Sequence, residues 1–535
     1  MTALPLLSLS LLLIACDSSS DDTGPQDSAG SVDLDQDGYP ESEDCDDRDA
    51  AVHPDTPDIC NGKDDDCDED VDEDPDVLWY PDDDGDGFGN PTDGGTPSCS
   101  PQAGAVSNGL DCNDADASTF PGAWDRCDGG DQDCDGFVDE DEAVFVDASA
   151  GSGGDGSADA PFDRIQAALD AGGQCLFVAA GTYREKVLVK GQAVRIVSVD
   201  GPESTIIDTS CGGRPLTVAY TGDGWVHVQG FRLGGGCEEL GGGLYAIGST
   251  VSLQDVDFYK NQASSAGGGI YAESSVFVFT DVSVRSNVAT EVAGGALFIT
   301  SSVQASNLSF TANEAGSVAG GMYVYNEVDM EATGITFDRN AAYAVAAAYL
   351  SGGSSVTFVQ ADVRANAAEV AGGFYVDDRS ELTLVNAVLD GNRATDYASA
   401  IDVYSATANL QNVTIAHNTG YAAVRVWTYG YLWIQDTIVA SNIGYGIYSD
   451  KSLYGFGVSY SDIWGNSTGN WAGRYTSAPD STDISADPQF VSSGASDPWD
   501  DDLHLRSGSP CENSGSRKTT DWDGSAMDMG AYGGP

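Results

Sequence analysis

Hydrophobic and polar residues alternate along most of the second half of the chain. Apolar pairs two residues apart precede an asparagine, as in Val256 and Phe258 before Asn261. Asparagines then recur every 24 to 27 residues, at positions 261, 287, 313, 340, 366, 392, 418, 442 and 466. A period of two indicates β-strands, and a repeat of this length is typical of a solenoid whose coils stack about 4.8 Å apart. The asparagines are interpreted as an amide ladder inside one turn of each coil.

A second register assigns an inside and an outside to the solenoid wall. Apolar residues at positions 270, 296, 322, 348, 374, 400 and 426 are predicted to face the core. The adjacent column is then predicted to face outward: Tyr245, Tyr271, Leu297, Tyr323, Tyr349, Tyr375, Ile401 and Trp427. Such a ladder offers a stacking surface for sugar rings or a protein partner, with these candidate ligand-binding residues: Tyr271, Tyr323, Tyr349, Tyr375 and Trp427. The alternative is that loops cover this face, or that a register slip near Ile401 turns tyrosines inward.

The segments on either side of the repeats predict how the solenoid begins and ends. Residues 143–147 are predicted to form a strand, 161–172 a short helix and 175–189 a strand again. This order resembles the entrance of pectin-lyase-like right-handed parallel β-helices. The resemblance implies an all-β fold over residues 143–486, with a short capping helix at its N-terminal end. Residues 487–535 resemble the closing segment of bacterial β-helix surface proteins and are expected to cap the last coil.

Composition changes sharply before the solenoid. The 535-residue chain carries a net charge of −64, and 42 acidic but only 3 basic residues fall between positions 17 and 142. No basic surface remains to neutralise phosphates, so nucleic-acid binding is excluded. The hydrophobic content of 41% is enough for a large core, so the chain as a whole is not disordered.

The acidic region repeats with a period of 67 residues. Three cysteines keep their spacing in the two copies, as Cys45, Cys60 and Cys67 and as Cys112, Cys127 and Cys134. Each copy opens with acids at alternate positions followed by glycine, which directs carboxylates from loop positions 1, 3 and 5 onto one hard cation. Three ladders, closed by acids at later positions, are predicted to bind Ca²⁺: Asp33, Asp35, Asp37 and Asp44; Asp82, Asp84, Asp86 and Asp93; and Asp131, Asp133, Asp135, Asp139 and Glu142. A fourth ladder, beginning at Asp64, lacks the glycine and is a doubtful site.

Acid ladders combined with this cysteine spacing resemble the MopE-type metal-binding repeat of bacterial surface proteins and the calcium-binding thrombospondin type 3 repeats. The resemblance covers about residues 33–142 and implies loop-rich, disulfide-linked calcium-binding repeats. An EF-hand is not indicated, because no amphipathic helix flanks the ladders. The alternative is a solvated acidic spacer, in which the carboxylates would repel one another without a cation.

The first residues form a targeting segment. Residues 4–15 are apolar apart from Pro5, Ser8 and Ser10 but too short to span a bilayer, and the sequence Leu13-Ile14-Ala15-Cys16 resembles a bacterial lipobox. The resemblance implies a signal peptide over residues 1–15, a lipid on Cys16 and a flexible tether over residues 16–32. The absence of Lys or Arg from residues 1–5 leaves two alternatives open, a mispredicted start or an ordinary signal peptide with a chance cysteine. Twelve cysteines suit an oxidising compartment, and without Cys16 an odd number remains.

Together these features predict a calcium-binding lipoprotein of the bacterial cell envelope, held at the outer membrane or cell surface by its N-terminal lipid alone. Its β-helix is expected to present an adhesion surface for extracellular polysaccharide or a surface protein. The alternative is a polysaccharide lyase or glycoside hydrolase, for which the fold alone is no evidence. Its weak catalytic candidates on the predicted outer face are Asp377, Asp378, Asp402 and Arg425.

Overall fold

The computed structural model describes most of the chain from Leu78 onward and a few positions before it. The described residues are 39, 45–46, 52, 54, 67, 78–98, 103–123, 131–134, 143–198, 200–222, 224–450, 452–476, 480–494, 497–516, 525 and 527–532. Several predicted site residues lie outside them: Cys16, Asp33, Asp35, Asp37, Asp44, Asp135, Asp139 and Glu142. The chain divides into one compact unit of residues 1–77 and 97–99 and a larger one of residues 78–96 and 100–535.

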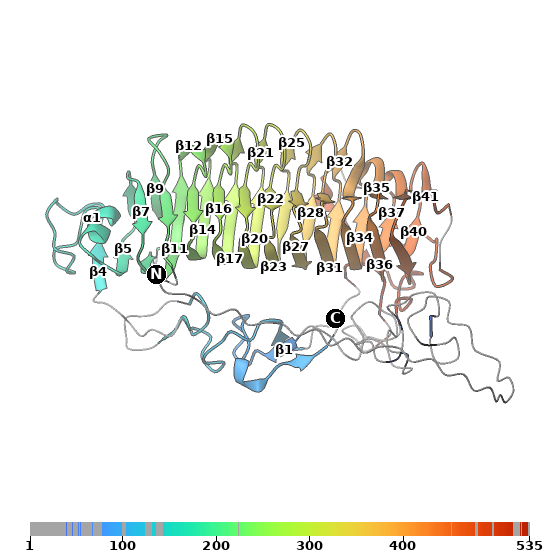
Figure 1. The fold of residues 1–535 in the computed structure, drawn as a ribbon, viewed down its shortest axis with the longest axis horizontal. Helices are drawn as coiled ribbons and strands as arrows, with labels where there is room; N and C mark the ends of the chain where they lie inside the picture. Colours follow the sequence, from blue (N-terminus) through green and yellow to red (C-terminus); the bar gives the residue numbers. More distant parts are fainter. Residues whose placement is uncertain are drawn as a thin grey trace, which may run out of the picture. The chain divides into compact units, whose positions relative to one another are not determined.

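The larger unit contains a parallel β-helix of about 11 turns, as predicted (Figure 1). One set of strands pairs coil to coil in the order of the chain: β7 (Val187–Lys190), β10 (Leu216–Ala219), β12 (Cys237–Leu240), β13 (Leu244–Ile247), β15 (Gln262–Ala266), β16 (Ile270–Glu273), β18 (Val288–Ala289), β19 (Ala296–Ile299), β21 (Glu314–Ala315), β22 (Met322–Tyr325), β25 (Ala341–Ala342), β26 (Ala348–Ser351), β29 (Ala367–Ala368), β30 (Phe374–Asp377), β32 (Arg393–Ala394), β33 (Ala398–Tyr404), β35 (Thr419–Trp427), β38 (Ile443–Ser449) and β41 (Gly469–Gly473).

A second set forms the rest of the wall: β4 (Ala143–Val146), β5 (Cys175–Val178), β6 (Gly181–Tyr183), β8 (Val194–Val197), β9 (Thr205–Asp208), β11 (Trp225–Gly234), β14 (Thr250–Tyr259), β17 (Val276–Arg285), β20 (Ser302–Thr311), β23 (Asp329–Thr333), β24 (Thr336–Asp338), β27 (Ser355–Val359), β28 (Asp362–Arg364), β31 (Glu381–Asp390), β34 (Thr407–Ala416), β36 (Tyr431–Gln435), β37 (Ile438–Ala440), β39 (Gly455–Ser459) and β40 (Asp462–Trp464). Outside the β-helix lie β1 (Leu78–Pro81), η1 (Pro91–Asp93), β2 (Thr96–Pro97), β3 (Ala105–Val106), β42 (Phe490–Ser492), η2 (Pro498–Asp500) and β43 (Asp502–Leu505).

The asparagine ladder is confirmed. From Asn261 to Asn442, each side-chain Nδ2 donates to the Oδ1 of the ladder asparagine in the next coil, at 2.9–3.1 Å. Asn466 continues the series to Asn470. Each amide also donates to a backbone carbonyl, as Asn366 does to Phe337. The ladder therefore satisfies buried backbone groups at a corner where the strands cannot pair.

The entrance of the β-helix also follows the prediction, with shorter elements. Helix α1 spans Ile165–Asp170, and Glu185 accepts hydrogen bonds from the backbone N–H groups of Ile165 and Gln166 at its first turn. The predicted strand over residues 175–189 is divided into β5, β6 and the start of β7, because the chain turns the corners of the first coil there.

The outer column differs from the prediction after Tyr375. The pairing of β30 with β33 places Ile401 beside Phe374, inside the core, and Asp402 beside Tyr375. Strand β33 carries a register shift between Ala398 and Ile401, so the extra residue moves the column by one position. The assignment of Ile401 to the outer face is therefore wrong. Trp427 pairs with Tyr404, which pairs with Asp377, and so lies in a neighbouring column.

The upstream part of the outer column is largely covered. Tyr271 is only 8% exposed and packs with Ala266, Ala293 and Leu297 in a small apolar cluster outside the main core. The fully solvent-facing position predicted for Tyr271 is therefore wrong. Tyr323, Tyr349 and Tyr375 are partly buried, and the rings of the first two stack with centroids 4.6 Å apart. These positions are therefore less exposed than an open stacking surface requires.

The segment predicted to cap the last coil reaches along the side of the β-helix. Phe490, Leu503 and Met529 pack in one apolar cluster with Val388, Ala416 and Ile438 of the wall. Farther along, the indole Nε1 of Trp499 donates to Asp338 at 2.8 Å. The segment thus covers apolar side chains that the outer face of β31, β34 and β37 would otherwise expose. Among the described residues, no helix has the length and apolarity needed to cross a membrane.

Candidate metal centre

The second acid ladder forms a tight loop between β1 and η1. Gly85 and Gly87 have positive φ values of 83° and 96°, which allow the sharp turns that residues with a Cβ rarely adopt. Asp82 accepts from the backbone N–H groups of both glycines. Asp84 and Asp86 each accept from the N–H two residues later. These bonds fix both oxygens of Asp82 and the Oδ1 of Asp84 and of Asp86, and they direct the side chains of the ladder together.

Two further acids join this loop from a later part of the chain. Asp84, Asp111 and Asp114 offer ligand atoms within 4.8 Å of one another, and so do Asp82, Asp84 and Asp86. Asp114 accepts from the backbone N–H of Asp83, and the second copy's disulfide, Cys112–Cys134, lies directly beside Asp111 in the sequence. Asp84 belongs to both groups, so the structure brings five carboxylates close to one another.

The orientation of these carboxylates fits a bound cation. Asp84, Asp86 and Asp111 each use Oδ1 to accept a backbone hydrogen bond, and the Oδ2 of each is buried without a hydrogen-bond partner. Asp111 is only 1% exposed. Burial and the neighbouring carboxylates raise the pKa values of Asp84 and Asp111, and raise the pKa of Asp86 to about 7. A cation at this point would supply the missing partner and relieve the repulsion.

The prediction therefore found the ladder but missed two of the five acids. It placed the closing ligand of this site at Asp93, whose backbone lies in η1 and whose side chain lies outside the described residues. Asp111 carried a usable signal, because it stands 67 residues after Asp44, the closing acid of the first ladder. The insert in the second copy separates Asp111 from its ladder in sequence but not in space.

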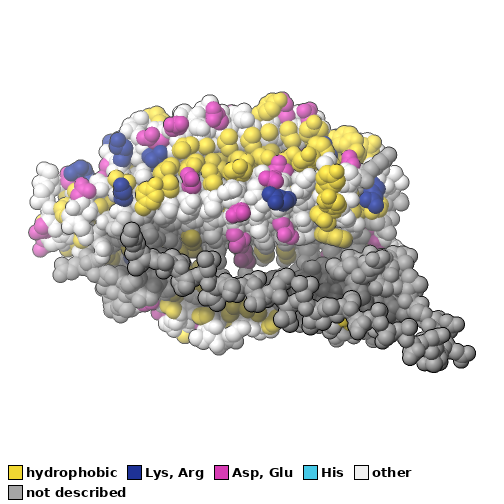
Figure 2. Space-filling model, viewed as in Figure 1, with side chains coloured by type: hydrophobic (Ala, Val, Ile, Leu, Met, Phe, Trp, Pro, Cys, Tyr) yellow, Lys and Arg dark blue, Asp and Glu magenta, His cyan; other side chains and the backbone are white. Residues whose placement is uncertain are grey.

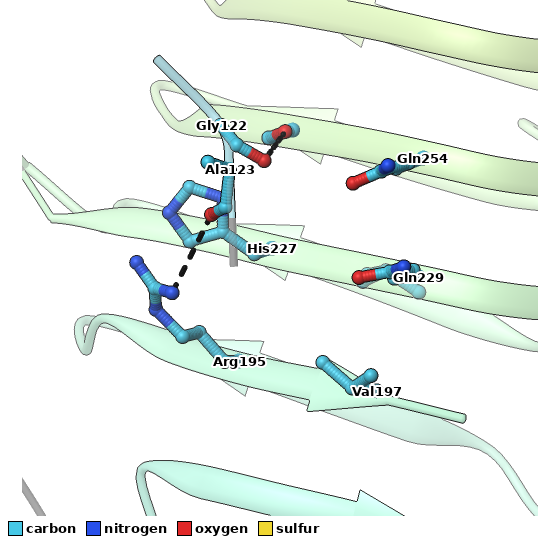
Figure 3. Close-up of a pocket in the computed structure, with 9 residues that line it drawn as sticks. Gly122, Ala123, Arg195, Val197, His227, Gln229 and Gln254 are labelled. Atoms are coloured by element: carbon cyan, nitrogen blue, oxygen red, sulfur yellow. Dashed lines mark hydrogen bonds between the residues drawn. The ribbon is translucent and has the colours of Figure 1, made fainter. Parts of the chain in front are cut away.

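The third ladder begins against the β-helix. Asp133 is buried and pairs through Oδ2 with the Arg195 guanidinium and with His227 Nε2, the latter at 2.9 Å. Figure 3 shows Arg195 and His227 beneath the backbone of Gly122 and Ala123, in a small pocket that Gln229 and Gln254 also line. Arg195 donates to the Ala123 carbonyl, and Ser252 to that of Gly122. The second copy is therefore docked on strands β8, β11 and β14, while the metal role of Asp131 and Asp133 stays a prediction.

The disulfides follow the repeat. Cys45–Cys67 and Cys112–Cys134 both join cysteines 22 residues apart, so the two copies share one covalent frame. Cys211–Cys237 links two adjacent coils near the start of the β-helix. Among the described cysteines, Cys511 is a free, buried thiol; the odd number that remains without Cys16 requires at least one cysteine that is free or paired outside the chain.

The weak catalytic candidates do not form one open acid–base cluster. Asp402 is 0% exposed and receives two hydrogen bonds from Arg425 and one from the indole of Trp427. Burial raises the pKa of Asp402, and the charge and hydrogen bonds of Arg425 offset only part of that effect. Asp377 accepts from the Tyr349 hydroxyl at 2.7 Å, whereas Asp378 is exposed. Asp402 and Arg425 therefore act on each other as a buried ion pair.

Comparisons with known proteins also divide the chain into acidic repeats and a β-helix. Residues 44–73 and 111–140 match a family model named for copper binding in MopE and described as "Putative metal-binding motif". Residues 242–415 match the model described as "Right handed beta helix region". The chain thus carries two copies of a metal-binding motif followed by a right-handed β-helix. No curated protein matches it.

Three solved structures illustrate the likeness in fold. Pectate lyase Pel9A is 15% identical, with 74% of this chain and 96% of that chain covered and a TM-score of 0.39. Rhamnogalacturonan lyase is 10% identical, with 66% and 91% covered and a TM-score of 0.27. The mannuronan C-5 epimerase AlgE6 A-module of Azotobacter vinelandii is 13% identical, with 61% and 94% covered and a TM-score of 0.27. At identities this low, the activities of these three proteins are not evidence for the activity of this chain.

Proposed function

We propose that this protein is a calcium-binding lipoprotein of the bacterial cell envelope whose β-helix binds polysaccharide. The observation that carries the calcium site is the set of buried, unpartnered oxygens on Asp84, Asp86 and Asp111. Carboxylate oxygens are the ligands that Ca²⁺ prefers, whereas copper sites in proteins favour imidazole nitrogen in the donor set. The five side chains of the site, which include Asp82 and Asp114, offer oxygen alone.

Calorimetric titration of the full chain tests the metal. The three predicted ladders should bind about three Ca²⁺ ions, with dissociation constants of roughly 10⁻⁴ to 10⁻³ M as in other extracellular modules. Asp111→Asn should weaken one of these sites at least about tenfold, because it removes a buried charged ligand. Asp83→Asn is the matched control, since Asp83 lies in the same loop with an exposed side chain. Tighter binding of Cu²⁺ than of Ca²⁺, or equal losses in the two variants, would contradict the proposal.

The polysaccharide surface is assigned to the exposed aromatic residues of the last coils. Figure 2 shows hydrophobic side chains in a band along one face of the β-helix. Tyr429, Tyr431, Trp433 and Tyr454 are exposed, and Tyr454 lies within 5.6 Å, centroid to centroid, of both Tyr429 and Tyr431. Grouped exposed rings support stacking on sugars better than the partly buried tyrosines of the predicted ladder.

A glycan array, read with and without a chelator, tests this surface. The β-helix domain is itself acidic, so we expect a neutral glycan, or an acidic one only when calcium bridges the two. Replacing Tyr431, Trp433 and Tyr454 by alanine should reduce glycan binding by tenfold or more. Tyr343→Ala, at an equally exposed tyrosine of another coil, should leave it unchanged. Unchanged glycan binding in the triple variant would remove the support for this surface.

The lipid anchor rests on the lipobox resemblance at Cys16 alone. Cys16→Ser should abolish incorporation of labelled lipid and release the protein from the membrane fraction, because the acylated cysteine would be its hydrophobic anchor. Continued membrane association of this variant would contradict the lipoprotein assignment. Calcium binding by the released protein would be unaffected, so the two parts of the proposal are tested separately.

A further inference from the structure

The side wall of the β-helix carries a second group of metal-ligating side chains, none of which belongs to the acidic loop. Asp390 ends strand β31, and His417 follows β34 on the next coil. Asp501 comes from the C-terminal segment, directly after η2. One ligand atom from each residue lies within 4.8 Å of the other two. His417 Nδ1 is 2.9 Å from Asp390 Oδ1 and 3.3 Å from Asp501 Oδ2.

Burial leaves an excess of negative charge at this point. The side chains of Asp390 and Asp501 are 0% and 2% exposed, and the single imidazole of His417 faces both. Asp390 Oδ2 is also buried and has no hydrogen-bond partner. The guanidinium of Arg364 contributes some positive charge, but it is paired with Asp362 and donates to the carbonyl of Pro498. A divalent cation at this point would balance the charges of the two buried carboxylates.

The donor set indicates which cation fits. One imidazole nitrogen with two carboxylates suits first-row divalent metals, whereas Ca²⁺ takes oxygen ligands. Metal–ligand bonds of about 2.0–2.2 Å in a tetrahedral site place the donor atoms roughly 3.3–3.5 Å apart. The two distances from His417 Nδ1 are within about half an ångström of that spacing. Little rearrangement would be needed to admit the ion.

We propose that Asp390, His417 and Asp501 bind a first-row divalent metal ion, with Zn²⁺ as its most suitable probe, and that this ion fastens the C-terminal segment to the wall. His417 is the most exposed of the three ligands, so water can complete the coordination from its side. Neighbouring contacts already place the segment on this wall. Arg339 pairs with Asp497 at 2.7 Å, and the Arg364 guanidinium lies over the Trp499 ring. The metal would join residues more than 80 positions apart in sequence.

The test is a Zn²⁺ titration of the full chain with the acidic repeats saturated by Ca²⁺. The wild-type protein should bind one Zn²⁺ that His417→Gln and Asp390→Asn weaken at least 100-fold. His504→Gln is the matched control, because His504 also contacts an aspartate, Asp502, but is exposed. This variant should bind Zn²⁺ as the wild type does. Zn²⁺ should also slow proteolysis of the C-terminal segment in the wild type and in His504→Gln, but not in His417→Gln.

Co²⁺ provides a readout that does not depend on the folding of any variant. The wild-type protein in excess Ca²⁺ should give the visible absorption of a low-symmetry nitrogen and oxygen site, and Zn²⁺ should abolish it. Wild-type protein that binds neither ion in excess Ca²⁺ would overturn the proposal. Retention of the site in both His417→Gln and Asp390→Asn would also overturn it. The cluster would then be an ion-pair network in which a protonated imidazole joins two carboxylates.

Discussion

Replacing Asn366 by alanine tests how much the amide ladder contributes to the stability of the β-helix. The Asn366 Oδ1 accepts from the backbone N–H and from the Nδ2 of Asn340, at 2.9 and 3.0 Å. Truncation of Asn366 leaves the backbone N–H of Asn340 buried without a partner. It also leaves one of the two Nδ2 hydrogens of Asn340 without a partner, while the other keeps its bond to the Phe310 carbonyl. Each orphaned group costs about 1–3 kcal/mol. The variant should therefore lose about 2–6 kcal/mol of unfolding free energy.

Urea denaturation followed by far-UV circular dichroism measures this loss, and amide hydrogen exchange locates it. Exchange should accelerate most in the coils on both sides of Asn366, because each coil contacts only its neighbours. Asn409→Ala is the matched control, since Asn409 is partly exposed and bonds to the surface residue Glu381. It should cost less than about 1 kcal/mol. Equal losses in the two variants would refute the assignment of the ladder as a stabilising network.

Two further predictions concern buried charges. Arg425→Met should lower the free energy of unfolding by about 3–5 kcal/mol, because Asp402 would be left buried and unpaired. The double variant Arg425→Met with Asp402→Leu should recover most of that loss, as measured by thermal unfolding. Burial raises the pKa of Asp462 to about 6, above its ordinary value of 3.8, so the folded state holds this proton more tightly than the unfolded chain. The resulting stabilisation is complete below about pH 4 and lost as the pH rises through 6. Asp462→Asn should remove up to about 3 kcal/mol from the pH dependence of the unfolding free energy. If the variant and the wild type lose stability with pH in the same way, the raised pKa of Asp462 is contradicted.

Local periodicity in the sequence was sufficient to predict the coils and the metal loop. Each ladder asparagine follows an apolar pair at a nearly constant interval, and this pattern specifies a strand, a corner and the next strand without reference to distant residues. The acids at 82, 84 and 86 likewise form their loop through hydrogen bonds to nearby backbone N–H groups. Features of this kind are predictable because the groups that interact lie within one repeat.

Only the tertiary structure decided which residues complete the sites and which side chains face solvent. Asp111 joins the loop because an insert folds back, and Asp501 reaches His417 because the C-terminal segment runs along the wall. The register shift before Ile401 buries that residue and places Asp402 in the column of Tyr375. Such outcomes depend on how loops close and where a single extra residue is absorbed. The 67-residue repeat marks Asp111, but no repeat places Asp501 near His417 or decides which coil absorbs the extra residue, so the period of the sequence carries no record of those two outcomes.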